Sequence, residues 1–491
     1  MVEKLTQEIY KMKRIITTKT PFAIVKKSVN DLVNFVKPTF GPSENKVLIH
    51  DEFQPIVLDD GVRIAEKFSS NDRIENTIIN LIKAVSKKTN KRVGDGTTGS
   101  MILLQSIINE LPDIFDSSSI VKELKAGLEE AVKQLKSKSK PVTTKKQLLE
   151  VALVSCNNKE IAEIISEVIN NVGPDGSVSV EEGSENKTTY EITDGFQFDQ
   201  GYVSHYMANI PEKMESCLKN ARVLIADKTL EISDVMPLME KLVKLPIQEK
   251  RILIIANDFS QDLTTLLVVN GMKGVFDIVA VKSPGFGKEK LELLRDIASV
   301  CNTRICDDQN KVEDITYEQL GHAEKIVVNQ NETIIFKGGG NTSDRIKYLK
   351  GIKPSSDFDA KKITDRIAKL SNGIAVIKAG GFTEEEMRSV KEKIDDAVNA
   401  TKVAYKHGIV PGAGIALSKI KTLSETLNKA LKAPKNILKE NIGIESNIKE
   451  DIHDPTEVLV AGLESAVSIA CLLIATKGIL VTYEEEKHDK F

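Results

Sequence analysis

The residues of this chain best suited to chemistry form the glycine-rich segment Gly94-Asp95-Gly96-Thr97-Thr98-Gly99, which lies between two helical patterns. Glycines let backbone N–H groups approach an anion closely, and a helix that follows directs its positive end toward that anion. The threonine hydroxyls add donors, and the Asp95 carboxylate is an oxygen ligand of the kind that Mg²⁺ prefers. No lysine follows the glycines, so the segment is not a P-loop. On its chemistry alone it indicates either a phosphate site or a helix start capped by Asp or Thr.

Three further groups of residues could complete such a site. Thr39-Phe40-Gly41-Pro42 forms a turn at the end of a helical pattern, and Asp59-Asp60-Gly61 places two acids directly before a glycine. Asp396 lies in a long helical pattern, and Asp454 precedes a proline. Adjacent acids are usually solvated or cap helices, so their meaning depends on the residues that the fold brings around them.

The composition is typical of a globular protein and excludes several classes of partner. Hydrophobic residues make up 41% of the 491 residues and charged residues 28%, and this length predicts about two to four domains. The net charge of −3 provides no strong field toward nucleic acid or an anionic membrane. Tryptophan is absent and aromatic residues make up only 5%, so stacking on bases is not expected. We therefore expect neither nucleic acid nor a membrane as a partner.

Cysteines, the N-terminal residues and the apolar stretches predict a cytoplasmic protein. The five cysteines are scattered, and the spacing of Cys301 and Cys306 fits no common zinc motif, so we expect buried residues that pack like small apolar ones. Residues 1–14 carry six charged side chains rather than a secretory leader. The most apolar stretch, 465–476, has 12 uncharged residues, fewer than the roughly 18 that span a bilayer. We expect it to be a buried helix.

Hydrophobic periodicity predicts a helical part built from both ends of the chain, with an α/β part inserted between them. The segments expected first are a helix (5–36, ended by Pro38), a hairpin (46–50 and 55–58) and helical patterns (76–109 and 120–137). A stretch rich in Lys, Ser and Pro, 136–146, marks the first boundary.

From about 194 to 374, strand and helix patterns alternate. The alternating segments are strands at 221–226, 251–256 and 277–282 and helices at 234–243 and 263–272. A long helix over 383–406 follows, and the chain then ends on the buried helix. The predicted plan is nested, with an outer helical domain, a connector that the chain crosses twice, and an inserted α/β domain.

Nine motifs in order along nearly the whole chain resemble the group I chaperonins, the GroEL family. They are TFGP, DDGV, GDGTT, FQFDQGYVSHYM, PEKM, VAVKSPGFG, IDDAVNATK, VPGAGIAL and DPTEV. The resemblance implies a multidomain α+β and α/β fold with a helical equatorial domain, a small intermediate domain and an inserted α/β apical domain. The implied bounds are 1–141 and 407–491 (equatorial), 142–193 and 375–406 (intermediate), and 194–374 (apical).

The resemblance further implies an ATPase whose activity is coupled to protein folding. The implied ATP-binding residues are Thr39, Phe40, Gly41, Pro42, Asp59, Asp95, Gly96, Thr97, Thr98, Gly99, Gly412, Ala413 and Asp454. Asp95 would bind Mg²⁺, with K⁺ as a further candidate ion. Asp396 would position or activate the attacking water, and Asp60 matches a second acid implicated in hydrolysis. Because Asp396 lies on the connector, hydrolysis would depend on domain closure.

Apolar residues of the implied apical domain would bind unfolded client proteins. They are Tyr202, Tyr206, Met207, Met236, Met239, Val268 and Val269. The two methionines stand where the family commonly has leucines, and their soft side chains suit promiscuous binding. The same residues could instead pack the apical core, since helical spacing alone does not distinguish core from rim. The family also implies a homo-oligomeric ring of seven subunits, and a co-chaperonin lid would dock on these same residues.

The chain departs from the family at four places. Asp59 replaces a lysine and so introduces repulsion toward phosphates, Gly99 replaces a threonine, and Ala413 replaces a glycine. The interval from Gly414 to Asp454 is 40 residues, much shorter than in the family, and the loss falls between 444 and 453. In the family this stretch contacts the adenine base and supplies much of the ring-to-ring contact. We therefore expect a single ring or easily separated rings, and nucleotide binding that is weaker and less selective for adenine.

Two functions remain open from the sequence. The first is an ATP-driven folding machine that encloses clients, and the retained acids at positions 60, 95, 396 and 454 favour it. The second is a holdase or scaffold ring with weak or absent hydrolysis, which Asp59 and the shortened segment favour. The shortened chain resembles the divergent chaperonins encoded by large bacteriophages, for which the location would be the cytoplasm of an infected host.

Overall fold

The computed structural model forms two compact units, one of which contains both ends of the chain. The residues described are 13–16, 21–43, 45–50, 55–58, 60–112, 114–174, 176–183, 185–211, 214–246, 249–307, 309–354, 356–371, 373–442 and 452–482. The first unit comprises Met1–Asn170 and Arg388–Phe491, and the second is the single stretch Asn171–Met387. The finer division into equatorial, intermediate and apical domains stays a prediction.

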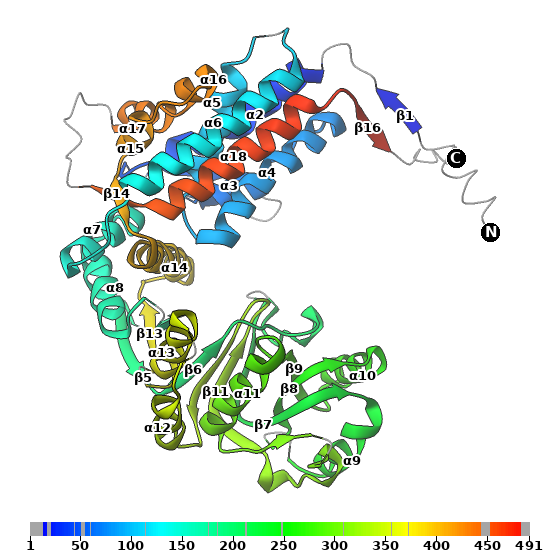
Figure 1. Cartoon of the computed structure of the whole chain (residues 1–491). Helices are drawn as coiled ribbons and strands as arrows, with labels where there is room; N and C mark the ends of the chain where they lie inside the picture. Colours follow the sequence, from blue (N-terminus) through cyan, green and yellow to red (C-terminus); the bar gives the residue numbers. More distant parts are fainter. Residues whose placement is uncertain are drawn as a thin grey trace, which may run out of the picture. The chain divides into compact units, whose positions relative to one another are not determined.

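The centre of the first unit is α18 (Thr456–Ala475), which packs against α4 (Arg73–Val93), α5 (Thr97–Asn109) and α6 (Ser117–Lys138) (Figure 1). In the described part of the chain it is the one helix long and apolar enough to cross a membrane, but 72% of its apolar window is buried inside the structure. The predicted buried helix is thus confirmed. The helix begins before the uncharged stretch from which it was predicted. Its first half includes Glu457 and Glu464, whose charges the helix accommodates because both side chains lie at its surface and pair with Arg92.

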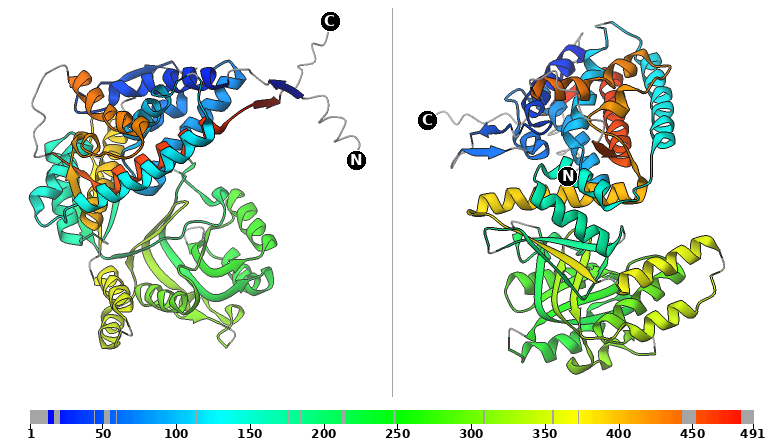
Figure 2. Two further views of the ribbon diagram at one scale, coloured as in Figure 1. Left: turned by 45° about the horizontal axis from the view of Figure 1, so that its top comes forward. Right: turned by 90° about the vertical axis from the view of Figure 1, so that its left-hand side faces the viewer.

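The N-terminal part of the first unit corrects one prediction. The helix expected over 5–36 is α2 (Pro21–Val36), whereas β1 (Lys13–Ile16) is a strand that pairs antiparallel with β16 (Ile479–Thr482) (Figures 1 and 2). Proline at the first helical position favours a helix start at Pro21. The predicted hairpin is confirmed, since β2 (Val47–Ile49) pairs antiparallel with β3 (Ile56–Leu58).

The first unit contains further helices and two short strands. They are α3 (Gly61–Lys67), α7 (Lys145–Cys156), α8 (Lys159–Val172), α14 (Glu384–His407), β14 (Ile409–Pro411), α15 (Ile415–Ser418), α16 (Glu425–Ala430), α17 (Ala433–Ile442) and β15 (His453–Pro455). Helices α8 and α14 continue into the second unit. β14 pairs antiparallel with β15. This pairing places Val410 opposite Asp454, although α15, α16 and α17 lie between the two strands in the sequence.

The second unit is an α/β structure with the alternation predicted from the sequence. Its main sheet has the order β6-β12-β11-β7-β8-β9, and β10 also pairs with β7. The strands are β6 (Gly195–Phe198), β7 (Ser216–Leu230), β8 (Arg251–Phe259), β9 (Asp277–Lys282), β10 (Ile305–Cys306), β11 (Gly321–Val328) and β12 (Thr333–Gly338). β7, β8 and β9 are parallel, and α9 (Ile232–Val243) and α10 (Gln261–Met272) connect them. Right-handed crossovers place these two helices on one face and α11 (Gly287–Cys301), which leads back to β10, on the other.

A smaller sheet and a helical pair complete the second unit. β4 (Ser177–Glu182), β13 (Ile374–Ala379) and β5 (Thr189–Thr193) form a three-stranded sheet with β13 in the middle. α12 (Ser343–Gly351) packs against α13 (Asp357–Ser371), and the two lie side by side in Figure 2. Four of the five cysteines are buried, as expected, and Cys217 is half-buried.

Candidate functional site

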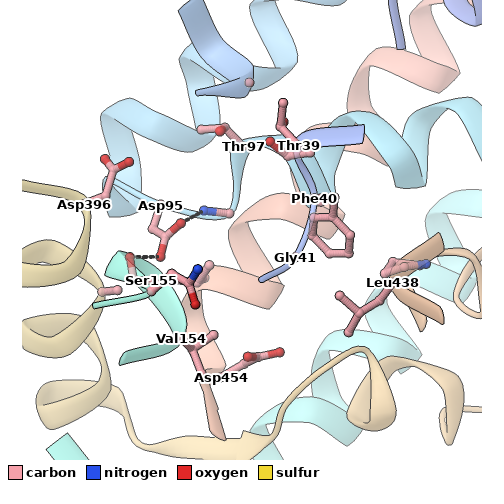
Figure 3. Close-up of a pocket in the computed structure, with 18 of the residues that line it drawn as sticks. Thr39, Phe40, Gly41, Asp95, Thr97, Val154, Ser155, Asp396, Leu438 and Asp454 are labelled. Atoms are coloured by element: carbon pink, nitrogen blue, oxygen red, sulfur yellow. Dashed lines mark hydrogen bonds between the residues drawn. The ribbon is translucent and has the colours of Figure 1, made fainter. Parts of the chain in front are cut away.

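A cavity of about 670 Å³ lies within the first unit, where residues of the glycine-rich segment and of all three further groups predicted from the sequence meet (Figure 3). Its walls come from the turn after α2, the starts of α3 and α5, the end of α7, the middle of α14, and the segments around β14 and β15. Segments from both ends of the chain therefore build one site. We call it the central cavity.

The glycine-rich segment forms the start of α5 at the wall of the central cavity. Gly96 occupies the helix N-cap with φ 76°, a left-handed conformation that glycine adopts without strain. A Cβ at this position would lie 2.5 Å from Val458 Cγ1, so a side chain does not fit. No side chain caps α5, and its first residues, Thr97 and Thr98, line the cavity. The interpretation as a helix start capped by Asp or Thr is therefore wrong, because the N-cap residue is a glycine and the helix start opens on a cavity instead.

Asp95 is half-buried and held in a fixed orientation by two donors. Ser155 Oγ donates to one carboxylate oxygen at 2.9 Å, and the backbone N–H of Gly96 donates to the other (Figure 3). Burial raises the pKa of Asp95, and the charge of Asp60 raises it further, while the two hydrogen bonds oppose this shift. An oriented carboxylate whose ionised form is costly to keep buried is well suited to a bound cation.

Asp60 caps the start of α3 on the same wall. Its carboxylate accepts hydrogen bonds from the backbone N–H groups of Val62 at 3.2 Å and Arg63 at 3.0 Å. The next residue, Gly61, packs so closely on α5 that a Cβ would lie 2.2 Å from Thr98 Oγ1. This contact explains why a glycine follows the two acids. It also brings together two motifs that are separate in the sequence.

Asp396 extends the acidic cluster from α14. Burial raises the pKa of its carboxyl well above the ordinary value, and the charges of Asp95 and Asp60 raise it further. Figure 3 shows its side chain on the same side of the cavity as Asp95. A carboxylate with a raised pKa is a stronger base, so Asp396 has the properties of a residue that takes a proton from water.

The opposite end of the cavity combines one acid with apolar side chains. Burial raises the pKa of Asp454 to about 7 and the charge of Asp95 contributes, while the backbone N–H of Ala413 donates to its carboxylate. Ala413 has φ 54°, a left-handed conformation that is strained for a residue with a side chain. Leu438, Ile442 and Ile452 line the cavity here and give it an apolar surface.

Nearly all of the predicted pocket residues line the central cavity. They are Thr39, Phe40, Gly41, Pro42, Asp60, Asp95, Gly96, Thr97, Thr98, Gly99, Asp396, Ala413 and Asp454. Gly412 lies beside it, where its N–H donates to the carbonyl of Ile452 at 2.7 Å. Asp59 and the stretch 443–451 lie outside the described residues. Other lining residues were not predicted from the sequence, among them Ser155, Asn157, Ser389, Glu392, Lys393 and Leu438.

The donor set of the central cavity fits a magnesium ion held together with a substrate. Within the described ranges, no group of three or more His, Cys, Asp or Glu residues is arranged to hold a metal by itself. Mg²⁺ is usually bound by one or two carboxylates, with waters and substrate phosphates supplying the other ligands. Asp95, oriented by Ser155, is the carboxylate that fits this role.

The apolar residues predicted to bind clients all belong to the second unit, but they differ in exposure. Tyr206, Met236 and Val269 are exposed, and Val268 is half-buried against the core. Three others are buried in the core, namely Tyr202, Met207 and Met239. For these three the structure corrects the prediction of an exposed rim. The Tyr202 hydroxyl donates to the carbonyl of Met214 at 3.2 Å, and Met207 Sδ accepts from the N–H of Ala280 at 3.4 Å.

Comparisons with known proteins agree with this architecture. The model of the TCP-1/cpn60 chaperonin family matches residues 32–446, so the chain belongs to this family. The fold is similar to that of two crystal structures of the chaperonin gp146 from the bacteriophage EL 2 (Pseudomonas aeruginosa), both obtained in the presence of ATP-BeFx.

The two crystal forms of gp146 match nearly the whole length of the chain. Crystal form II has a TM-score of 0.71 at 20% sequence identity and covers 95% of this chain and 98% of that chain. Crystal form I has a TM-score of 0.65 at 19% identity and covers 95% and 99%. The predicted chaperonin family and multidomain fold are confirmed.

Proposed function

We propose that this protein is the subunit of an ATP-dependent chaperonin that forms a ring, binds unfolded polypeptides and promotes their folding through nucleotide-driven domain movement. The observation that carries the proposal is the central cavity, in which the start of α5 meets the half-buried carboxylates of Asp60, Asp95 and Asp396. The presence of ATP-BeFx in the crystals of the related gp146 supports a nucleotide as the ligand.

Phosphoryl transfer to water depends on positioning and on charge stabilisation, and residues of the cavity could provide both. The first N–H groups of α5 and the hydroxyls of Thr97 and Thr98 would bind phosphate oxygens. Asp95 would hold Mg²⁺, which when bound neutralises part of the phosphate charge. Asp396 would orient the attacking water and accept its proton, because burial and neighbouring acids make this carboxylate more basic.

Exposed apolar residues on two neighbouring helices support the binding of unfolded chains. Met236 and Val243 on α9, together with Val269 and Met272 on α10, are exposed large apolar side chains. Clustered apolar groups on a protein surface commonly mark a site of interaction, and methionine adapts to partners of different shape. We propose that these residues and Tyr206 bind clients, and that a co-chaperonin lid would dock on the same surface.

The hairpin β2–β3 supports assembly into a ring. Leu48 and Val57 are directly paired across the hairpin and are 70% and 57% exposed. A two-stranded sheet is marginally stable alone, and its unpaired edges attract a further strand. We propose a ring of seven subunits, single or easily separated, for which sedimentation velocity and electron microscopy give the subunit and ring count. Replacement of Leu48 and Val57 by serine should shift the species toward monomers.

A second candidate function is a ring that holds unfolded chains with weak or absent hydrolysis. One observation favours it: the cavity is lined by several carboxylates that would repel a polyphosphate. They are Asp60, Asp95, Glu392, Asp396 and Asp454.

Steady-state phosphate release from ATP separates the two functions. For the chaperonin ATPase we expect turnover by the wild-type ring and a fall in kcat of about 10²- to 10⁴-fold for Asp396→Ala, with little loss of ATP affinity. Glu385→Ala, at an exposed position on the same helix, serves as the matched control and should keep full activity. A wild-type ring that captures unfolded chains but releases no phosphate would establish the holdase instead.

A further inference from the structure

The wall of the central cavity contributed by α14 carries a basic residue that the proposed mechanism has not used. Lys393 lines the cavity together with Ser389 and Asp396 on the same helix. Their spacing of four and three residues places all three on one face of α14. Lys393 therefore lies one helical turn from the acid proposed to activate water.

A second helix locates Lys393 near the acidic cluster. Cys156, the last residue of α7, also lines the cavity, and it follows Ser155, which donates to Asp95. Burial raises the pKa of the Cys156 thiol, and the positive charge of Lys393 partly opposes this shift. Lys393 is thus close to the end of α7, on the side of the cavity where Asp95 and Asp396 lie rather than at its apolar end.

The charge balance of the cavity gives Lys393 its importance. Among the described residues that line the cavity, Lys393 is the one basic side chain, against the five carboxylates named above. The neighbouring basic residue Arg63 is directed to Glu392, with 3.0 Å between Nη1 and Oε2. A triphosphate entering this cavity meets strong repulsion, which the partial positive charge at the start of α5 offsets only in part. A lysine on a flexible four-carbon stem is a common phosphate ligand.

We propose that Lys393 is a phosphate-binding residue whose ammonium group contacts the terminal phosphate of the nucleotide. The terminal phosphate is the part of the ligand that must lie near Asp396, because Asp396 is the acid proposed to orient the attacking water. The inference rests on the proposed nucleotide binding and adds to it a residue that distinguishes ATP from ADP. A lysine that only neutralised the carboxylates would stabilise the cavity without this distinction.

Calorimetric titration of the full-length ring with Mg·ATP and with Mg·ADP tests the proposal. We expect Lys393→Met to weaken ATP binding by about 10- to 100-fold, as for the loss of a charge-assisted contact, and to weaken ADP binding by less than about threefold. Lys393→Arg should recover most of the ATP affinity. Lys391→Met is the matched control, since Lys391 lies on the same helix but does not line the cavity, and it should bind both nucleotides as the wild type does.

The outcomes separate this inference from the proposed function. A wild-type protein that binds neither nucleotide overturns both. If the wild type binds ATP and Lys393→Met binds it with the same affinity, the inference alone is overturned. An equal loss of affinity for ATP and ADP also overturns it, because that result indicates a structural role for Lys393. Thermal unfolding of each variant identifies misfolding. If Lys393→Met does not fold, Lys393→Gln, with a polar side chain of similar length, replaces it. This variant should likewise lose more affinity for ATP than for ADP.

Discussion

His453 Nδ1 lies 3.1 Å from Oε2 of Glu150, and this contact joins β15, which carries Asp454, to α7, which carries Ser155. Neither residue lines the central cavity, but each is on the element that positions a residue of the cavity. The two elements pack together at this pair. The contact therefore fixes the position of Asp454, at one end of the cavity, relative to Ser155 at the other end.

We predict that His453→Ala and Glu150→Ala each weaken ATP binding by a few-fold while lowering the free energy of unfolding by no more than about 1 kcal/mol, since the pair is only partly buried. The double variant should be no weaker than either single variant, because both changes remove the same contact. A double-mutant cycle by calorimetry measures this coupling. Additive losses of binding free energy would show that the two residues act independently.

Asp454 makes the stability of the nucleotide-free protein depend on pH. Its folded-state pKa of about 7 lies above the ordinary value of 3.8, so between these values the native state keeps a proton that the unfolded chain has lost. The contribution of this group is therefore fully present below about pH 4 and is lost as the pH rises through 7. Asparagine resembles the protonated form and lacks this dependence.

We accordingly predict that Asp454→Asn stabilises the nucleotide-free protein at pH 8, by at most about 4 kcal/mol, and has a much smaller effect at pH 5. Thermal unfolding in EDTA at the two pH values measures the difference. Asp344→Asn, at a carboxylate whose side chain is 93% exposed, is the control and should change neither midpoint. If Asp454→Asn stabilised the protein equally at pH 5 and pH 8, the raised pKa of Asp454 would not be the cause of the stabilisation.

Ala413 is predicted to be a position where glycine is better than alanine. Its φ of 54° costs a residue with a side chain roughly 1–2 kcal/mol, and the greater freedom of glycine in the unfolded chain offsets part of that gain. Ala413→Gly should therefore stabilise the protein by up to about 1 kcal/mol. Ala126→Gly, at an exposed position inside α6, should destabilise it by about 1 kcal/mol. Denaturant unfolding of both variants measures whether the free energy of unfolding rises for Ala413→Gly and falls for Ala126→Gly. An equal fall for both variants would exclude backbone strain at position 413.

The sequence predicted most of the central cavity because its key residues lie in short local structures. Gly96 at a helix start and Asp60 before a glycine have signatures within a few neighbouring residues, so type and spacing mark them as candidates, and the resemblance to the chaperonin family assigns their roles. Ser155 and Lys393 have no such signature, since each reaches the cavity only because one face of its helix happens to pack there. The same limit explains the error at Lys13–Ile16, whose strand partner lies at the other end of the chain.

Depth of burial was the other property that spacing did not determine. Met236 and Met239 are three residues apart on α9, yet Met236 is 42% exposed and Met239 is 4% exposed. Met239 packs with Leu238 and Leu242 in the core of the second unit. How far each position on a helix is covered depends on the elements packed around it, which the local sequence does not specify.

These two methionines therefore form a matched pair for testing client binding. We predict that Met236→Ser reduces capture of a chemically unfolded protein and changes the free energy of unfolding by less than about 0.5 kcal/mol, because the side chain is already in contact with solvent. Met239→Ser should instead destabilise the second unit by about 2–5 kcal/mol through loss of buried apolar volume and burial of a hydroxyl. Capture measured by light scattering and stability measured by denaturant unfolding separate the two effects. If Met236→Ser leaves capture unchanged while Met239→Ser abolishes it at a temperature where the variant stays folded, clients bind at a surface that includes Met239, and α9 must then move to expose it.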